Sequence, residues 1–204
     1  MPLPTIALDI DDTLSLTKEY LITFLANNYN ISTNLDPQSF LKRYKNPEDH
    51  PNWQSHNIQS TIAHTYNDPA FLNKIPPRLI AQKYLTKFGT SIKISCYISS
   101  RLDCHTSLTK KWLMRHRFPN ASVILRQPHI KKHDWKLTSL AQQHLQTHYL
   151  IDDHLLNLQS QTIASYPKAL WYNPYQIIQD SGTIKVFNHW KQIYKFLKDH
   201  PKMP

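Results

Sequence analysis

Glycine is nearly missing from this sequence, because only Gly89 and Gly182 occur among its 204 residues. A protein of this length would ordinarily contain roughly 14, at a typical share of about 7%. The glycine-rich loops that hold phosphate groups, the GxGxxG and Walker A motifs, need several glycines close together. Both motifs are therefore excluded, and any bound phosphate must be held in another way.

Cysteine and long apolar runs are scarce too. The two cysteines, Cys96 and Cys104, form no CxxC pair, which argues against a structural zinc site and a disulfide framework. No apolar run approaches the roughly 18 residues of a membrane span. The first residues, MPLPTIALDI, lack the basic start of a signal peptide. We therefore expect a cytoplasmic protein with no membrane partner.

Charge is unevenly distributed along the chain. The formal net charge is +10, and residues 101–204 contain 15 Lys and Arg against 6 Asp and Glu. This excess favours an anionic ligand, while a basic surface that merely faces solvent would explain it equally well. Nucleic acid is a possible partner but a less favoured one than a small phosphorylated substrate. The oligomeric state stays open.

Short apolar runs alternate with helical patterns along the chain. Strands separated by helices indicate βαβ units, so the predicted fold class is α/β with a mainly parallel sheet flanked by helices. The predicted strands are 5–10, 92–98, 121–125, 148–153, 168–172 and 183–187. The predicted helices are 17–29, 37–44, 76–89, 106–117, 133–147 and a last one from Trp190. Residues 46–75 are predicted to form short helices and loops.

Polar residues follow three of the predicted strands. In parallel sheets, ligands bind beyond the carboxyl ends of the strands, so these residues should converge on one place. They are Asp9 and Asp11, then Ser99 and Ser100, then Asp152 and Asp153.

Such a cluster of acids fits a phosphoryl-transfer site. Mg²⁺ prefers oxygen ligands, which Asp9 and Asp152 can supply. The Asp9 carboxylate can attack phosphorus, and Asp11 can give and take the proton that the reaction needs. Ser99 can donate a hydrogen bond to a phosphoryl oxygen, and a nearby lysine would stabilise the developing charge.

Four stretches in order resemble the haloacid dehalogenase-like (HAD) superfamily. Asp9-Ile10-Asp11-Asp12-Thr13 is similar to its DxDxT first motif. Ile98-Ser99-Ser100-Arg101 is similar to the second motif, and Ile151-Asp152-Asp153 to the fourth. The third motif is a lysine upstream of the fourth. We choose Lys136, and Lys131 and Lys132 stay open as alternatives.

The resemblance implies a Rossmann-like core and Mg²⁺-dependent phosphoryl transfer. It makes Asp9 the nucleophile and Asp11 the general acid and base, with Ser99 and Lys136 as their catalytic partners. The metal ligands would be Asp9, Asp152 and the backbone carbonyl of Asp11, with Asp153 directly behind them. The substrate-binding residues would be Thr13, Ser100 and Arg101. For Arg101, pairing with an acid is an equal alternative to binding phosphate.

The resemblance also implies a domain division. Residues 1–15 and 90–204 would form the catalytic core, and residues 16–89 a small helical cap inserted after the first strand, of the C1 type. The segments SLTKEYLITFLANNYN and TKKWL resemble the 5'(3')-deoxyribonucleotidase-like branch. The aromatic cap residues Trp53, Tyr66 and Phe71 are expected in the cap's core, with stacking on a base as the alternative.

The expected function is therefore a Mg²⁺-dependent phosphatase acting on a small phosphomonoester through an aspartyl-phosphate. A nucleoside monophosphate is the leading substrate. Two alternatives stay open. One is a phosphatase acting on polynucleotide ends, and the other is a non-catalytic binding protein with the same fold.

Overall fold

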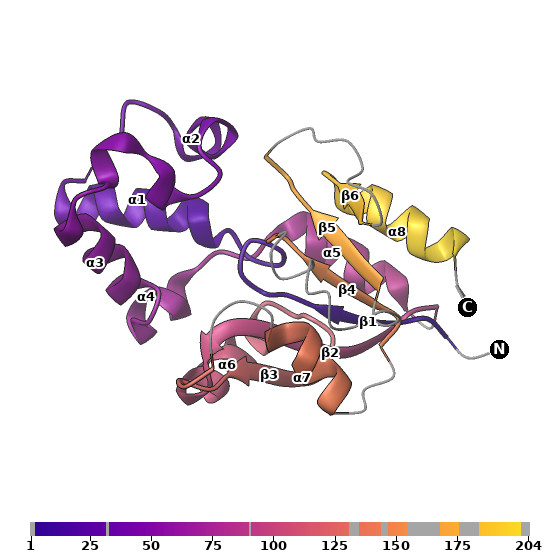
Figure 1. Ribbon diagram of the computed structural model, residues 1–204. Helices are drawn as coiled ribbons and strands as arrows, with labels where there is room; N and C mark the ends of the chain where they lie inside the picture. Colours follow the sequence, from indigo (N-terminus) through magenta and orange to yellow (C-terminus); the bar gives the residue numbers. More distant parts are fainter. Residues whose placement is uncertain are drawn as a thin grey trace.

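The fold is seen in a computed structural model, which describes residues 3–31, 33–89, 91–130, 135–143, 147–154, 168–175 and 184–200. These residues form a six-stranded sheet in the order β3-β2-β1-β4-β5-β6, and each neighbouring pair is parallel (Figure 1). The expected α/β class with a parallel sheet is confirmed. The strands are β1 Thr5–Leu8, β2 Lys93–Leu102, β3 Ser122–Arg126, β4 Tyr149–Asp152, β5 Lys168–Tyr172 and β6 Lys185–Phe187.

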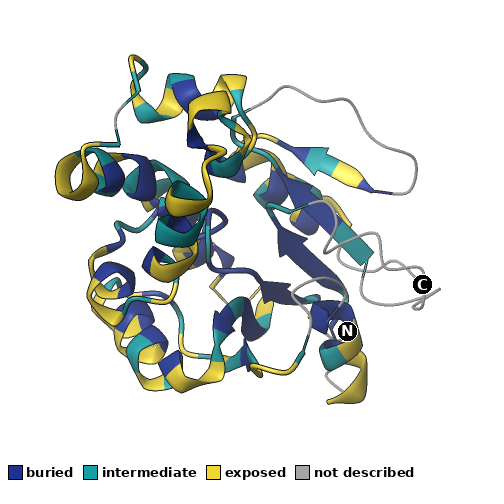
Figure 2. Cartoon of the chain, turned by 60° about the vertical axis from the view of Figure 1, so that its left-hand side comes forward, coloured by how far each residue is buried: buried dark blue, intermediate teal, exposed yellow. Residues whose placement is uncertain are grey.

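Alternate residues of the central strands pack into two separate apolar layers. On β1, Ile6 and Leu8 pack on one face of the sheet and Ala7 on the other. This two-residue period follows from strand geometry, in which successive side chains point to opposite faces. Both faces are covered, which is usual for parallel sheets, and the central strands are accordingly mostly dark blue in Figure 2.

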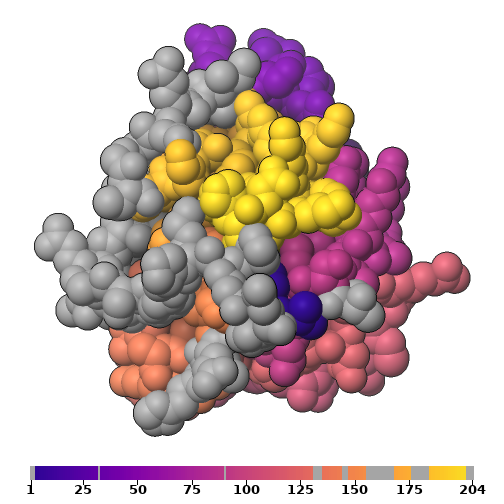
Figure 3. Space-filling view, turned by 90° about the vertical axis from the view of Figure 1, so that its right-hand side faces the viewer, coloured from indigo at the N-terminus to yellow at the C-terminus, as the bar shows by residue number. Residues whose placement is uncertain are grey.

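Among the described residues, three helices cover the first face and one covers the second. The first face packs against α5 (Leu79–Phe88), α6 (Thr106–Arg115) and α8 (Trp190–Asp199). The second packs against α7 (Trp135–Gln142). Helices α5 and α8 touch directly, with the rings of Phe88 and Tyr194 stacked 5.8 Å apart, and they lie next to each other in Figure 3.

A group of helices with its own apolar core lies to one side of the sheet (Figure 1). This core includes Trp53 and Phe71, both at most 1% exposed, so these two aromatic residues pack in the core of the helical group as expected. Asp36 begins α2 as predicted, since its carboxylate accepts from the backbone of Gln38 and Ser39. The elements are α1 Thr17–Tyr29, α2 Pro37–Arg43, η1 Pro47–Asp49, η2 Pro51–Trp53, α3 His56–Thr65 and α4 Pro69–Lys74.

The two segments that join this helical group to the sheet are paired with each other. Ser15 and Pro77 form an antiparallel bridge, and the Arg78 amide donates to the Leu14 carbonyl at 2.7 Å. The prediction that Pro76 and Pro77 open a helix was wrong, because both prolines lie in this joining segment and α5 begins at Leu79. Since α5 packs with the sheet, we propose that the cap ends before it rather than at residue 89.

Other predicted boundaries need correction too. Helix α7 ends at Gln142, whereas the prediction was 133–147, and β1 ends at Leu8, whereas the prediction was 5–10. Strand β2 continues through Leu102, so Ser99, Ser100 and Arg101 lie within the strand rather than after it. Pairing with β3 is irregular between Ser99 and Leu102, which marks where the strand end bends. Helix α6 ends at Arg115, not Arg117. In the described part of the chain, no helix combines the length and the apolar character needed to cross a membrane.

Candidate active site

Lys136 joins two aspartates that come from neighbouring strands. Its Nζ lies 2.5 Å from Asp9 Oδ1 and 2.6 Å from Asp152 Oδ2. Asp9 follows β1, Asp152 ends β4, and Lys136 is in the first turn of α7. All three side chains are at most 4% exposed. The lysine that the sequence favoured therefore meets the two acids, whereas Lys131 and Lys132 lie outside the described residues.

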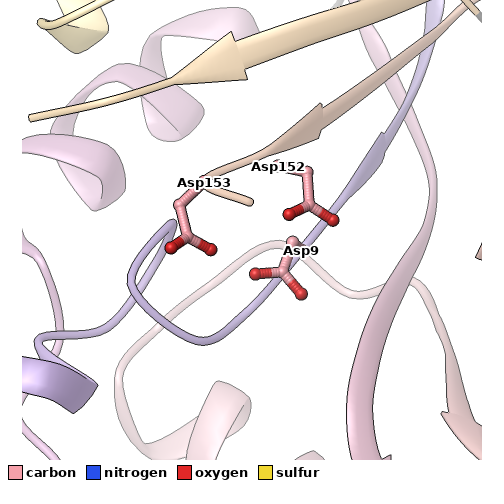
Figure 4. Close-up of side chains that lie close together, drawn as sticks. All are labelled: Asp9, Asp152 and Asp153. Carbon is pink, nitrogen blue, oxygen red and sulfur yellow. The ribbon is translucent and has the colours of Figure 1, made fainter. Parts of the chain in front are cut away.

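Three carboxylates gather at this point. One oxygen each from Asp9, Asp152 and Asp153 lies within 4.8 Å of the others, and Figure 4 shows these three side chains close together. A set of only oxygen donors suits a hard divalent cation such as Mg²⁺. These residues therefore fit a divalent metal, although the cluster contains the side chain of Asp153, which was expected behind the ligands.

The electrostatics of Asp9 reflect this crowding. Burial raises the pKa of Asp9 well above its ordinary value, and the charges of Asp152 and Asp153 raise it further, while Lys136 lowers it. Burial acts in the opposite sense on Lys136, but Asp152 and Asp9 outweigh it and raise the lysine's pKa. The lysine thus stays charged and offsets repulsion that would otherwise favour protonated acids.

Asp11 is paired with a different cation, Arg101. Arg101 Nε and Nη2 donate to its two carboxylate oxygens at 3.0 and 2.8 Å, and Ser99 Oγ donates at 3.0 Å. Although burial alone would raise it, the charge and hydrogen bonds of Arg101 lower the pKa of Asp11 to about 2. The expected general acid is therefore ionised in this arrangement, and Ser99 contacts it rather than an open site.

Asp12 shares a third cation, Lys18, with Asp153, and Lys18 Nζ lies 3.7 Å from Asp12 Oδ2. Asp12 adopts a left-handed φ of 60°, which aspartate tolerates better than most residues. Its carboxylate accepts from the Lys18 amide at 2.8 Å, and Lys18 Nζ lies 2.9 Å from Asp153. The three acids of the first motif therefore point to three different cations. The positive charge beside each carboxylate offsets the repulsion between the three acids.

Two further predicted residues lie at the edge of the site. Thr13 Oγ1 donates to Asp9 Oδ2 at 3.4 Å, so it contacts the expected nucleophile. Ser100 Oγ accepts from the Trp135 indole at 3.4 Å and lines the cavity described next. Ser100 therefore borders the cavity, whereas Thr13 is fully buried behind Asp9 and is not among the cavity's lining residues.

A cavity of about 460 Å³ opens above the carboxylates. Its floor includes Asp9, Asp11 and Lys136, and its roof comes from the group of helices beside the sheet. Among the roof residues the sequence pointed only to Tyr66, for which stacking on a base was the alternative to the cap's core. No motif marks the others, nor Arg126 and His154, which line the same cavity. The roof residues are Asn46, Glu48, Gln59, Ile62, Ala63, Tyr66, Asn67 and Leu72.

Solved structures identify the fold. An HAD family hydrolase from Deinococcus radiodurans with bound phosphate and sodium has a TM-score of 0.61 and 13% identity over 100% of this chain and 99% of its own. An HAD phosphatase from Thermococcus onnurineus scores 0.59 with 15% identity over 98% and 100%. The putative HAD-hydrolase YfnB from Bacillus subtilis, bound to magnesium, scores 0.57 with 12% identity over 97% and 99%.

The chain has the HAD-superfamily fold. No protein-family model matches its sequence, and no curated protein is significantly similar to it. The expected fold is thus confirmed, while the deoxyribonucleotidase-like branch stays a prediction. HAD structures similar to this chain include hydrolases, phosphatases and a 2-haloacid dehalogenase, so the fold alone does not select the reaction.

Proposed function

We propose that this protein is a phosphatase that hydrolyses a small phosphomonoester, with a nucleoside monophosphate as the leading substrate. The observation that carries the proposal is the Lys136 ammonium between Asp9 and Asp152 at the floor of the cavity. A buried cation beside a buried carboxylate can both hold a phosphate and spare the attacking group from repulsion. The phosphate bound to the Deinococcus radiodurans neighbour supports the same ligand class.

Asp9 would act as the nucleophile. One of its carboxylate oxygens forms a bond to phosphorus while the bond from phosphorus to the ester oxygen breaks. Lys136 stabilises the charge on the phosphoryl oxygens, and Thr13 orients the carboxylate through its contact with Oδ2. The cluster of Asp9, Asp152 and Asp153 would hold a divalent metal, preferably Mg²⁺, which when bound offsets the negative charge of phosphate.

Asp11 would handle the protons. In the first step the leaving oxygen takes a proton from the Asp11 carboxyl. In the second, water attacks phosphorus, the bond to Asp9 breaks and Asp11 takes the proton back. An acid at Asp11 favours a phosphatase over a dehalogenase, in which this carboxylate is unnecessary. Because Asp11 is paired with Arg101, we propose that the pair separates when substrate binds.

A phosphate-release assay tests the proposal. The full chain with Mg²⁺ should release phosphate from members of a panel of nucleoside monophosphates, sugar phosphates and 5'- or 3'-phosphorylated oligonucleotides. Asp9→Asn should abolish release while its circular dichroism spectrum stays unchanged. Phosphate release by Asp9→Asn would refute the assignment of Asp9 as the nucleophile.

The same panel separates the alternatives. Preference for oligonucleotide ends with strong salt dependence would favour a polynucleotide phosphatase. No release from any panel member would favour a binding protein.

A further inference from the structure

A second cavity, of about 290 Å³, opens beside the catalytic one. The two share four lining residues, Lys18, Asn46, Asp153 and His154. On its own the second cavity lies just below the range of roughly 300–1,000 Å³ that is usual for ligand pockets. As an extension of the first it has a natural role, because it can receive whatever part of a ligand projects past the carboxylates.

Aromatic rings form much of its wall. Trp171 and Tyr172 end β5, and Tyr175 follows them; Leu41 of α2 and Pro174 complete the apolar part. The catalytic cavity differs, since charged and amide side chains supply much of its lining. The two cavities therefore suit different parts of one ligand, an anionic part and a flat apolar part.

Contacts with neighbouring polar groups hold these rings in place. The buried Arg78 lies over the rings of Tyr172 and Tyr175, with its Cζ 5.6 and 5.7 Å from their centroids. Arg78 Nη2 donates to the Tyr175 hydroxyl at 3.0 Å, and that hydroxyl lies 3.0 Å from Glu19. The Trp171 indole donates to the Asp153 carbonyl at 2.9 Å. A wall held in this way is preorganised, so little ordering cost opposes a ligand that stacks on it.

We infer that the second cavity binds an aromatic or heteroaromatic ring in the leaving group of the substrate while the phosphate occupies the catalytic cavity. This inference rests on the proposed function and deepens it, because it assigns the ring to the end of β5 rather than to the cap's aromatic core. Amide side chains of Asn46 and Asn173 at the same cavity can contact the ring edge.

The test compares substrates that differ only by the ring. Ribose 5-phosphate has the sugar phosphate of a nucleoside 5'-monophosphate without its base. With base stacking worth about 1–3 kcal/mol, the wild type should hydrolyse at least one nucleoside 5'-monophosphate with kcat/KM about tenfold higher. Tyr175→Leu should remove most of this preference while turnover of ribose 5-phosphate is retained. Tyr175→Phe, which keeps the ring but loses the hydroxyl, should keep the preference. An equal preference in wild type and Tyr175→Leu would overturn the inference.

Inhibition of the wild-type enzyme provides a test that does not depend on correct folding of Tyr175→Leu. Nucleosides without phosphate should inhibit hydrolysis of ribose 5-phosphate competitively, whereas ribose alone should not. Calorimetric binding of the nucleosides should persist in Asp9→Asn, which no longer turns over. Nucleoside binding that depends on Tyr175 in a protein without phosphatase activity would refute the proposed function and spare the ring site. Phosphatase activity with no nucleoside binding would refute the ring site and leave the proposed function standing.

Discussion

The guanidinium of Arg101 donates two hydrogen bonds to the carboxylate of Asp11, through Nε at 3.0 Å and Nη2 at 2.8 Å. The arginine side chain is 2% exposed and the aspartate 28% exposed, so solvent reaches the acid but hardly the base. A planar guanidinium that donates twice is a strong partner for a carboxylate. The proposed proton donor is thus held in its ionised form by its neighbour in the second motif.

Arg101→Ala should move the pH dependence of catalysis. Arg101 lowers the pKa of Asp11 to about 2, so its removal raises that pKa, and the protonated form persists to higher pH. The alkaline limb of the kcat/KM profile, which reports the free enzyme and needs protonated Asp11, should therefore shift to higher pH. Rates measured from pH 4 to 9 check this. An unchanged limb, or a shift to lower pH, would show that Asp11 is not the acid.

Lys136→Met should destabilise the fold as well as abolish activity. The substitution leaves Asp9 and Asp152 buried without their cation, and breaking a buried pair costs about 3–5 kcal/mol. Urea denaturation measures the loss. Lys132→Met, the alternative candidate for the third motif, serves as the matched control and should retain activity and stability. If the control loses activity while Lys136→Met keeps it, the assignment is wrong.

Metal removal should stop turnover reversibly. Dialysis against EDTA should abolish phosphate release, and Mg²⁺ should restore it, because the three carboxylates of the cluster supply only oxygen donors. Asp152→Asn should weaken Mg²⁺ binding at least tenfold by calorimetry, since it removes a buried charged oxygen. Asp103→Asn, at an exposed acid outside the cluster, should bind Mg²⁺ like the wild type. Full activity in EDTA would count against a metal-dependent reaction.

The two cysteines should differ sharply in reactivity. Cys96 is buried in β2, and burial raises the pKa of its thiol to about 11, so little thiolate exists at pH 8. Cys104 is exposed. Iodoacetamide at pH 8 should therefore label Cys104 within minutes and Cys96 only after denaturation, which mass spectrometry of the peptides can follow. Rapid labelling of Cys96 in the folded protein would show that β2 opens.

Much of the fold could be predicted from the sequence because its causes are local. Apolar runs such as Thr5–Leu8 and Tyr149–Asp152 predict buried parallel strands, and Asp36 before Pro37 predicts the start of α2. The ends of the helices and strands could not all be predicted in this way. The continuation of β2 to Leu102 depends on its pairing with β3, a partner distant in the chain.

The sequence by itself determined which acids follow which strands, and therefore that Asp9 and Asp152 would meet, because strand order and direction bring carboxyl ends together. Only the tertiary structure decided how the charges pair. Lys136 with Asp9, Arg101 with Asp11 and Lys18 with Asp12 depend on distances between segments that no local pattern encodes. The aromatic cavity at the end of β5 likewise arises only where the cap and the sheet pack together.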